Sequence, residues 1–320
     1  MRLFVHIREQ GIVLALIFLF IAFSLATPHF LRATNLLNVL RQVSLLGIIS
    51  TGMTMVIISG EIDLSVGAVY GIGAISCGLA MKAGYPIWLA MAMAIAIGAF
   101  IGFSNGALVN YVKISSLIVT LGMLNVVRGS SLLLTGGLPV FVSPQTVHDP
   151  HLPVFFFLGQ GRIFNLIPML AIFFIGIVIF GYLVCHRSLF GFHLRAVGGN
   201  ARAARASGID VERTKSIAFV LISVLAALAG ILNLSFLSSV QGVVGAGLEL
   251  DAIAATVIGG TSLAGGEGTI IGTVIGVLII GILRNGLILL GVSPFWQTTL
   301  IGGIIIGAAA IDTITRKVRG

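Results

Sequence analysis

Apolar residues along the chain form long runs that are separated by short polar or glycine- and proline-rich breaks. A bilayer core about 30 Å thick requires roughly 20 apolar residues per helix, so most of these runs are long enough to cross a membrane. The pattern therefore predicts an all-α, polytopic membrane protein with one transmembrane domain over residues 1–320. About ten spans are expected, over residues 11–27, 36–59, 64–81, 86–109, 115–135, 163–185, 215–236, 249–260, 268–290 and 294–313.

Two of the breaks are rich in glycine and interrupt chain that would otherwise continue as helix, near residues 60–64 and 259–267. The apolar run 249–260 is too short to cross a membrane alone, which predicts a half-helix. Backbone that leaves the helix at membrane depth must face protein or water rather than lipid. Broken helices of this kind are typical of transport sites.

Five predicted spans precede the outer segment 136–162 and five follow it. An odd number of spans in each half gives the halves, about 1–135 and 163–315, opposite orientations in the membrane, as in many transporters. The stretches Val56–Gly60 and Val257–Gly260 resemble each other weakly, because both close an apolar run with glycine. We therefore expect two inverted five-helix halves.

Most of the 18 lysines and arginines fall in segments that are cytoplasmic if the N-terminus is cytoplasmic, above all in the segment 186–214. This distribution obeys the positive-inside rule, and ten spans then place both termini in the cytoplasm. The N-terminal run, with Arg2 and Arg8 ahead of it, also has the layout of a signal peptide. We favour a first transmembrane helix because the next apolar run follows closely.

Composition and motifs exclude several other classes of protein. The chain is 58% apolar and only 9% charged, with a mean hydropathy of +1.14. Its net charge of +8 is dispersed or lies at the ends of apolar runs, so no nucleic-acid partner is expected. No lysine follows the glycines of a phosphate-binding loop, so this chain is expected to bind no ATP or other cofactor and to be no enzyme. His148 and His151 lack further ligands, so no metal site is expected.

The segment 186–214 contains a candidate docking helix. Asn200 can cap a helix, Ala201–Ser207 are good helix formers, and Gly208 can end it. The alternative is a solvated basic loop, but small alanines would allow a cytoplasmic partner to approach closely. The candidate coupling residues are Gly199, Asn200, Ala203, Ala204, Arg205, Ser207 and Gly208.

Several polar residues within or beside the spans are candidates for a translocation pathway. A carboxylate at membrane depth costs about 2.5 to 3.5 kcal/mol, so it must be paired, capping or solvated. Asp63 is placed to cap the helix that begins near Leu64, and the alternative is a gate. Glu249 and Asp251 fit the first turn of a helix, where acids complement the dipole. The candidate pathway or gate residues are Glu61, Asp63, Ser65, Asn105, Asn125, Arg128, Asn233, Thr261 and Ser262.

Ordinary structural roles compete with the pathway assignment. Asparagines in membrane helices often bond neighbouring helices, and Arg128 could extend toward the interface or pair with an acid. The sequence alone leaves these alternatives open.

Four stretches, at residues 52–67, 121–129, 198–209 and 250–266, together identify a family. The chain resembles the ribose-type monosaccharide permeases of bacterial ABC importers, in the branched-chain amino acid/ribose permease superfamily, over essentially its whole length. One departure is Glu61, where relatives commonly carry glycine or another small or polar residue. The resemblance does not identify the sugar.

The resemblance implies a permease of the bacterial inner membrane that is homodimeric or paired with a related subunit. It further implies a cytoplasmic subunit that binds ATP and Mg, a periplasmic or extracellular sugar-binding protein, and a coupling helix at 199–209. We expect inward transport of a ribose-like sugar by alternating access, driven through this helix. The alternatives are a secondary sugar transporter that works alone, and a channel or membrane receptor.

Overall fold

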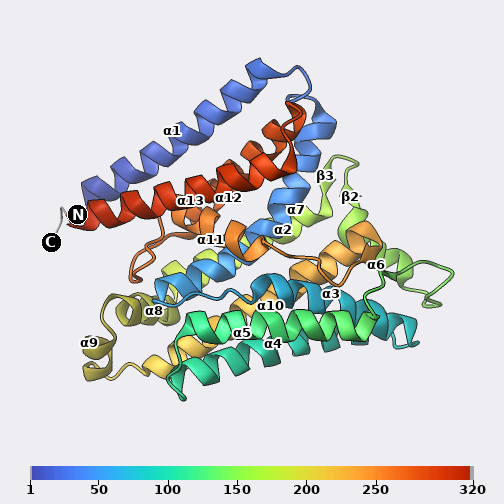
Figure 1. Ribbon diagram of the computed structural model, residues 1–320, viewed down its shortest axis with the longest axis horizontal. Coiled ribbons are helices and arrows are strands. Elements are labelled where there is room, and N and C mark those ends of the chain that lie inside the picture. The colour runs from blue at the N-terminus through green and yellow to red at the C-terminus, as the bar shows by residue number, and fades with distance from the viewer. Residues whose placement is uncertain (1, 318–320) are drawn as a thin grey trace.

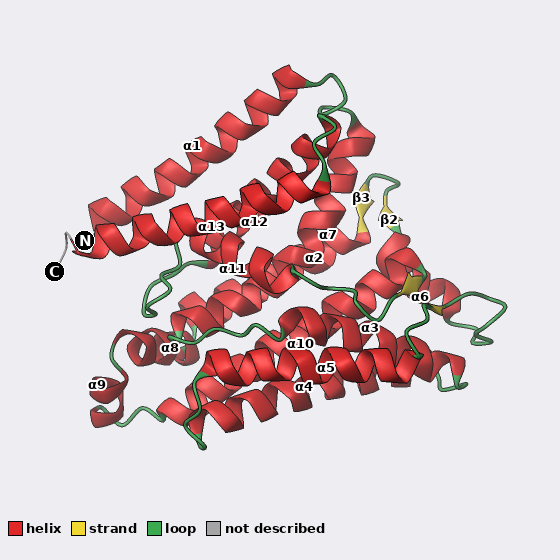
Figure 2. Ribbon diagram, viewed as in Figure 1, coloured by secondary structure: helices red, strands yellow, loops and turns green. Residues whose placement is uncertain are grey.

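The computed structural model describes residues 2–317 and is mostly helical (Figures 1 and 2). Its longer helices agree with the predicted spans to within several residues, which confirms the all-α prediction. They are α1 (Arg2–Ala26), α2 (Ala33–Ile58), α3 (Val66–Lys82), α4 (Ile87–Asn110), α5 (Ser116–Thr135), α7 (Met169–Tyr182), α10 (Val211–Leu237), α12 (Ile270–Leu289) and α13 (Pro294–Lys317). The shorter helices are α6 (Leu152–Gln160), α8 (Leu189–Gly199), α9 (Ala201–Ala206) and α11 (Leu248–Ile258), and a π-helical turn, η1 (Leu183–Arg187), extends α7.

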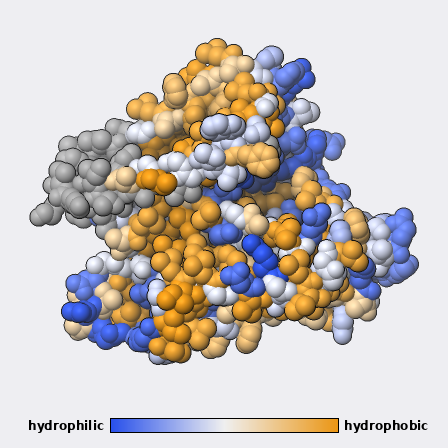
Figure 3. Space-filling model, in the orientation of Figure 1, coloured by the Kyte–Doolittle hydropathy of each residue, from blue (hydrophilic) through white to orange (hydrophobic). Residues whose placement is uncertain are grey.

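Six of the described helices are long and apolar enough to cross a membrane, namely α2, α4, α5, α7 with its π-turn, α10 and α12. The apolar parts of α1 and α3 are somewhat shorter. Large apolar side chains such as Phe18, Phe100 and Leu133 point outward, and Figure 3 shows hydrophobic residues over much of the helical body. Lipid is the solvent that suits such a surface, so the protein is a multi-pass membrane protein.

Helix α10 is the centre of the fold. It packs against α2, α3, α4 and α6, and most of its residues are buried. Glycines let the neighbouring backbones approach, as in other membrane helix pairs. A Cβ atom at Gly230 would overlap the carbonyl oxygen of Tyr70, and a Cβ at Gly102 of α4 would meet that of Phe219. In Figure 1, α1, α12 and α13 lie on one side of the molecule and α3, α4 and α5 on the other.

The outer segment 136–162, expected as a loop, contains regular structure that the sequence did not predict. Strand β1 (Val140–Phe141) pairs antiparallel with β4 (Ser239–Val240), and β2 (Arg162–Ile163) forms a hairpin with β3 (Ile167–Pro168). Asp149 accepts hydrogen bonds from the backbone N–H groups of His151 (2.7 Å) and Ile87 (3.0 Å). These bonds favour the ionised carboxylate and lower its pKa. The segment is thus tied to α4 and to the end of α10.

Candidate translocation and coupling sites

Both predicted breaks interrupt helices. Helix α2 ends at Ile58, and the chain runs without regular structure to Val66, where α3 begins. Helix α11 ends at Ile258, and α12 starts only at Ile270. Gly60 and Gly260, with φ angles of +85° and +93°, adopt the left-handed conformation that glycine allows. The glycines at these breaks are therefore required by the backbone.

A third interruption, between α10 and α11, lies at the predicted boundary between the spans 215–236 and 249–260, but its place inside the bundle was not predicted. Residues 241–247 form turns that carry the chain from β4 to the first residue of α11, and Gly245 packs against the first turn of α3. A Cβ atom at Gly67 would overlap both the Gly245 carbonyl oxygen and a carboxylate oxygen of Glu249. Helices α3 and α11 thus begin side by side inside the bundle.

The start of α3 gathers three of the predicted pathway residues. Asp63 is fully buried, and its Oδ1 accepts hydrogen bonds from the backbone N–H (2.8 Å) and the hydroxyl (2.6 Å) of Ser65. Asn105 of α4 donates from Nδ2 to the same hydroxyl at 2.9 Å. The helix begins at Val66, two residues after Leu64. Asp63 therefore bonds the backbone N–H of Ser65, the residue just before the helix, and not an N–H of its first turn. Asp63 Oδ2 and Asn105 Oδ1 have no partner among the described residues.

Glu61 has a different environment from Asp63. Its carboxylate forms an ion pair of 2.6 Å with Lys215 in the first turns of α10, and both side chains are mostly buried. The pair links the α2–α3 connection to the segment that follows α9.

The remaining predicted pathway residues are dispersed. Asn233 and Thr261 are buried, and each has a polar side-chain atom without a partner in the described part of the chain. Ser262 is also buried, and its backbone N–H donates to the Glu267 carbonyl oxygen at 3.0 Å. On α5, Asn125 is exposed and bonds only its own helix, at Leu121 O (2.9 Å), whereas Arg128 is half-buried. The nine candidates therefore do not form one cluster.

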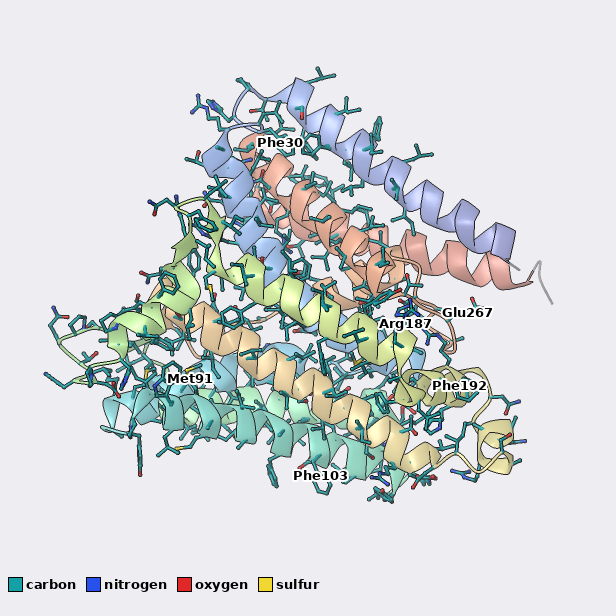
Figure 4. All side chains as sticks on the ribbon, turned by 180° about the vertical axis from the view of Figure 1, so that it is seen from behind. Phe30, Met91, Phe103, Arg187, Phe192 and Glu267 are labelled. Atoms are coloured by element: carbon teal, nitrogen blue, oxygen red, sulfur yellow. The ribbon has the colours of Figure 1, made fainter. Side chains whose placement is uncertain are left out.

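Glycines join the two predicted breaks to the end of α8, in a contact that we call the inner junction (Ile58–Gly60, Gly198–Gly199 and Gly265–Gly266). The Gly266 N–H donates to the Ile58 carbonyl oxygen at 2.8 Å. A Cβ at Gly198 would overlap that same oxygen. Figure 4 shows the labelled Arg187, Phe192 and Glu267 at this end of the molecule, far from Phe30. The segment leading into α9 therefore contacts both breaks directly.

The predicted docking helix is present as α9, and the preceding helix α8 was not predicted. Asn200 caps α9 by accepting hydrogen bonds from the N–H groups of Arg202 (3.1 Å) and Ala203 (3.0 Å). Gly208 follows the helix with a φ angle of +84°. Ala204 is buried against Val197 and Val211. The opposite face is exposed and carries Arg202, Ala203, Arg205 and Ser207.

Glu212, at the start of α10, fixes α9 to the rest of the protein. Its carboxylate pairs with Lys113 (2.7 Å), in the connection between α4 and α5, and with Arg205 of α9. Arg205 is predicted to flank a partner, and in the structure it pairs with Glu212.

Two charged residues within the predicted spans 36–59 and 268–290 have partners that the sequence did not identify. Arg41 belongs to α2 and stacks over the Phe236 ring at 5.6 Å. Arg284 belongs to α12 and pairs with Asp251. Hydrophobic runs do not show where a long side chain finds its partner.

A bundle of apolar helices that are interrupted beside buried polar groups defines a class of protein, the polytopic membrane permease. The profile of the family described as "Branched-chain amino acid transport system / permease component" matches residues 35–309. The chain belongs to this family.

Individual relatives agree with this assignment. The chain is 40% identical over 311 residues to the ribose import permease protein of Escherichia coli, covering 96% of this chain and 94% of the relative. It is 42% identical over 306 residues to the ribose import permease protein of Bacillus subtilis, covering 95% and 92%. It is 36% identical over 313 residues to the L-arabinose ABC transporter permease protein of Azospirillum brasilense, covering 98% and 90%. No solved structure shows significant similarity.

Proposed function

We propose that this chain is the membrane-spanning subunit of an ATP-driven importer that moves a monosaccharide inward by alternating access. The observation that carries the proposal is α9, a helix that Asn200 caps within the segment predicted to be cytoplasmic. The residues just before it, Gly198 and Gly199, contact both helix breaks through the inner junction. Similarity to ribose and arabinose permeases over nearly the full chain supports a ribose-like pentose or a related small sugar as substrate.

The coupling residues are Gly199, Asn200, Ala203, Ala204, Arg205, Ser207 and Gly208. Ala204 anchors α9 on the protein, while the exposed Ala203 and Ser207 leave a small-residue face for a partner. A force on α9 would reach the breaks because the inner junction is backbone against backbone, which deforms little.

The helix pattern supports about ten crossings in two inverted halves. Each half contains a long central helix, α2 or α10, followed by an irregular segment and a short helix, α3 or α11. From this correspondence we infer that the repeat of the first break lies at residues 238–247, and that the glycine motif at 257–260 belongs to a different position of the repeat. Ten crossings leave both termini in the cytoplasm.

The translocation pathway runs along α5 and the two interior helix starts. The outward face of α5 carries Asn125 and Ser130 beside Gly122, a mildly polar stripe on an otherwise apolar helix. A second copy of the chain placed against this face would enclose the stripe, so we infer a homodimer with the pathway between its subunits. Asp63, Ser65, Asn105, Arg128, Asn233, Thr261 and Ser262 would line it or position its walls, and Glu61 would act near its cytoplasmic end.

The partners follow from this role. A cytoplasmic subunit would bind ATP and Mg and seat α9, and a periplasmic or extracellular protein would deliver the sugar at the inner membrane of a bacterium. This chain itself would bind no cofactor.

The deciding experiment is ATP hydrolysis and sugar uptake by this chain reconstituted in vesicles with an ATPase subunit and sugar-loaded binding proteins. We expect uptake only with both partners and with ATP. Uphill accumulation without nucleotide or partner would instead identify a secondary transporter, and downhill flux alone would identify a channel.

A glycine pair offers a matched test of coupling. Gly208, after α9, and Gly84, between α3 and α4, have φ angles of +84° and +88°, and a Cβ atom at either position meets no neighbour. Gly208→Leu should lower sugar uptake per ATP hydrolysed, whereas Gly84→Leu adds the same backbone strain, about 1 to 2 kcal/mol, without that effect. Equal ratios in the two variants would contradict coupling through α9.

A further inference from the structure

The corner between α7 and α8 lies where the chain leaves a candidate membrane span. The span formed by α7 and its π-turn ends at Arg187, and α8 begins at Leu189. Ser188 joins the two, since its hydroxyl donates to the Val184 carbonyl oxygen (2.6 Å) and accepts from the Gly191 N–H (3.2 Å). Helix α8 therefore starts at the level of the membrane surface.

One face of α8 packs on the protein. Gly191, Leu194 and Val197 are buried, and α8 contacts both α2 and α10. A Cβ atom at Gly191 would overlap the Cys185 carbonyl oxygen of the π-turn. Arg195 donates hydrogen bonds to that same oxygen and to the Gly191 carbonyl oxygen. The helix is thus held against the bundle, and its opposite face has a defined orientation.

The opposite face of this corner is apolar and exposed. Ile179 and Leu183, four residues apart in the span, are 55% and 52% exposed, and Leu189 and Phe192 of α8 are 70% and 62% exposed. Arg187 follows Leu183 by four residues, so it lies near the same side of the helix. Within the span, such side chains face lipid. The lipid-facing surface of α7 therefore continues past Arg187 onto α8.

The charge of the corner selects among lipids. Arg187 is exposed and forms no ion pair or hydrogen bond with any described residue. Figure 4 labels Arg187, Phe192 and Glu267 at this end of the molecule, but Glu267 is not paired with the arginine. The stretch 183–209 contains four arginines and no acidic residue. A guanidinium matches the geometry of a phosphate group, and a basic segment beside a membrane attracts anionic lipids.

We propose that this corner is a binding site for an anionic phospholipid, in the leaflet on the α9 side of the membrane. Arg187 pairs with the lipid phosphate, and Leu189 and Phe192 insert among the acyl chains below the headgroups. Amphipathic helices with basic and large apolar side chains are typical of membrane interfaces. Lipid is favoured over a protein partner because the same apolar surface begins inside the span. The proposal does not depend on the proposed function.

The test is fluorescence quenching by brominated lipids, with the full-length chain in vesicles. The probe is Phe192→Trp in a chain whose two natural tryptophans, Trp88 and Trp296, are replaced by phenylalanine. Both brominated phosphatidylcholine and brominated phosphatidylglycerol should quench it. The apparent affinity should be about fivefold higher for phosphatidylglycerol, the effect of one arginine at a charged membrane surface. Leu189→Trp, on the same face, serves as a second probe if the first variant does not fold.

Matched controls distinguish a site from general attraction. Arg187→Gln should remove most of the preference for phosphatidylglycerol, whereas Arg202→Gln, the same change of charge on α9, should keep it. Phe103→Trp on α4 is a probe at a position that is 59% exposed and that Figure 4 shows far from Arg187. Both lipids should quench this control equally. An equal loss of preference in the two arginine variants would overturn the proposal.

Two further outcomes would contradict the proposal. If neither brominated lipid quenches the probes on α8, this face lies in water or against protein. If quenching is lost when the ATPase subunit is added, the face docks that partner instead of lipid, whereas unchanged quenching supports the lipid site. The measurement uses no sugar, so its failure leaves the proposed function standing, and a failure of sugar uptake leaves the lipid site standing.

Discussion

Helices α3 and α11 both begin inside the helical bundle, but their starts are stabilised in different ways. At α3, the Asp63 carboxylate is fully buried and accepts hydrogen bonds from Ser65. At α11, Asp251 pairs with Arg284, whose guanidinium reaches a cavity of about 220 Å³ between α2, α3, α11 and α12. The start of α3 is therefore a buried network without a basic partner among the described residues, whereas the start of α11 holds a partly exposed ion pair.

This difference indicates separate roles for the two starts. A buried hydrogen-bonded network fixes a helix in one position, while an accessible ion pair can exchange partners. The first turn of α3 is therefore held in place, and the first turn of α11 can change its contacts. Four substitutions, in order of decreasing effect, test this distinction.

The largest effect is expected at the contact between the two starts. Gly67→Val should lower the free energy of unfolding by about 3 kcal/mol, because its side chain would overlap the Gly245 backbone. The control is Gly122→Val on α5, where no atom lies within 4 Å of a Cβ. The melting temperature of the detergent-solubilised protein measures both, and similar melting temperatures would show that the two starts can separate freely.

A smaller loss is expected from Asp251→Asn, about 1 to 2 kcal/mol, because it leaves the Arg284 guanidinium without its counter-charge. Solvent reaches Arg284, so the loss stays below that of a fully buried pair. The melting temperature checks this value, and the double variant D251N/R284Q should recover part of it. A single variant as stable as wild type would show that the pair contributes nothing to the fold.

Asn105→Ala should cost about 1 kcal/mol, since it removes the hydrogen bond to the Ser65 hydroxyl. Its sugar preference in the uptake assay should match that of wild type, because the amide bonds the Ser65 hydroxyl and so positions the pathway wall. A changed preference would show that the start of α3 contacts the sugar directly.

The smallest effect is expected for Asp63→Asn, within about 1 kcal/mol of wild type. The asparagine keeps the acceptor for Ser65, and no basic residue pairs with Asp63 among the described side chains. Its new amide group can donate toward Asn105, whose Oδ1 has no partner in the described part of the chain. A melting temperature lowered as far as that of Asp251→Asn would show that the Asp63 charge itself is needed.

Much of the helical structure was predictable from the sequence, because in a membrane each helix satisfies its own backbone hydrogen bonds and needs a long apolar run. The breaks after Ile58 and Ile258 were predictable from glycine. The α9 helix was predictable because Asn200 and Gly208 act on their own neighbours. Features whose partners lie far along the chain were missed, such as the strand pair β1–β4 and the contact of the 241–247 turns with the first turn of α3.

The sequence by itself determined that the chain lies in a membrane, its longer helices, two of their breaks and the family to which the chain belongs. Only the tertiary structure decided that Glu61 pairs with Lys215, that Asp251 pairs with Arg284, and that the starts of α3 and α11 adjoin a cavity. The physical reason is distance along the chain. Apolar periodicity and capping are local, whereas a buried charge is stabilised by whichever residue the packed helices bring beside it.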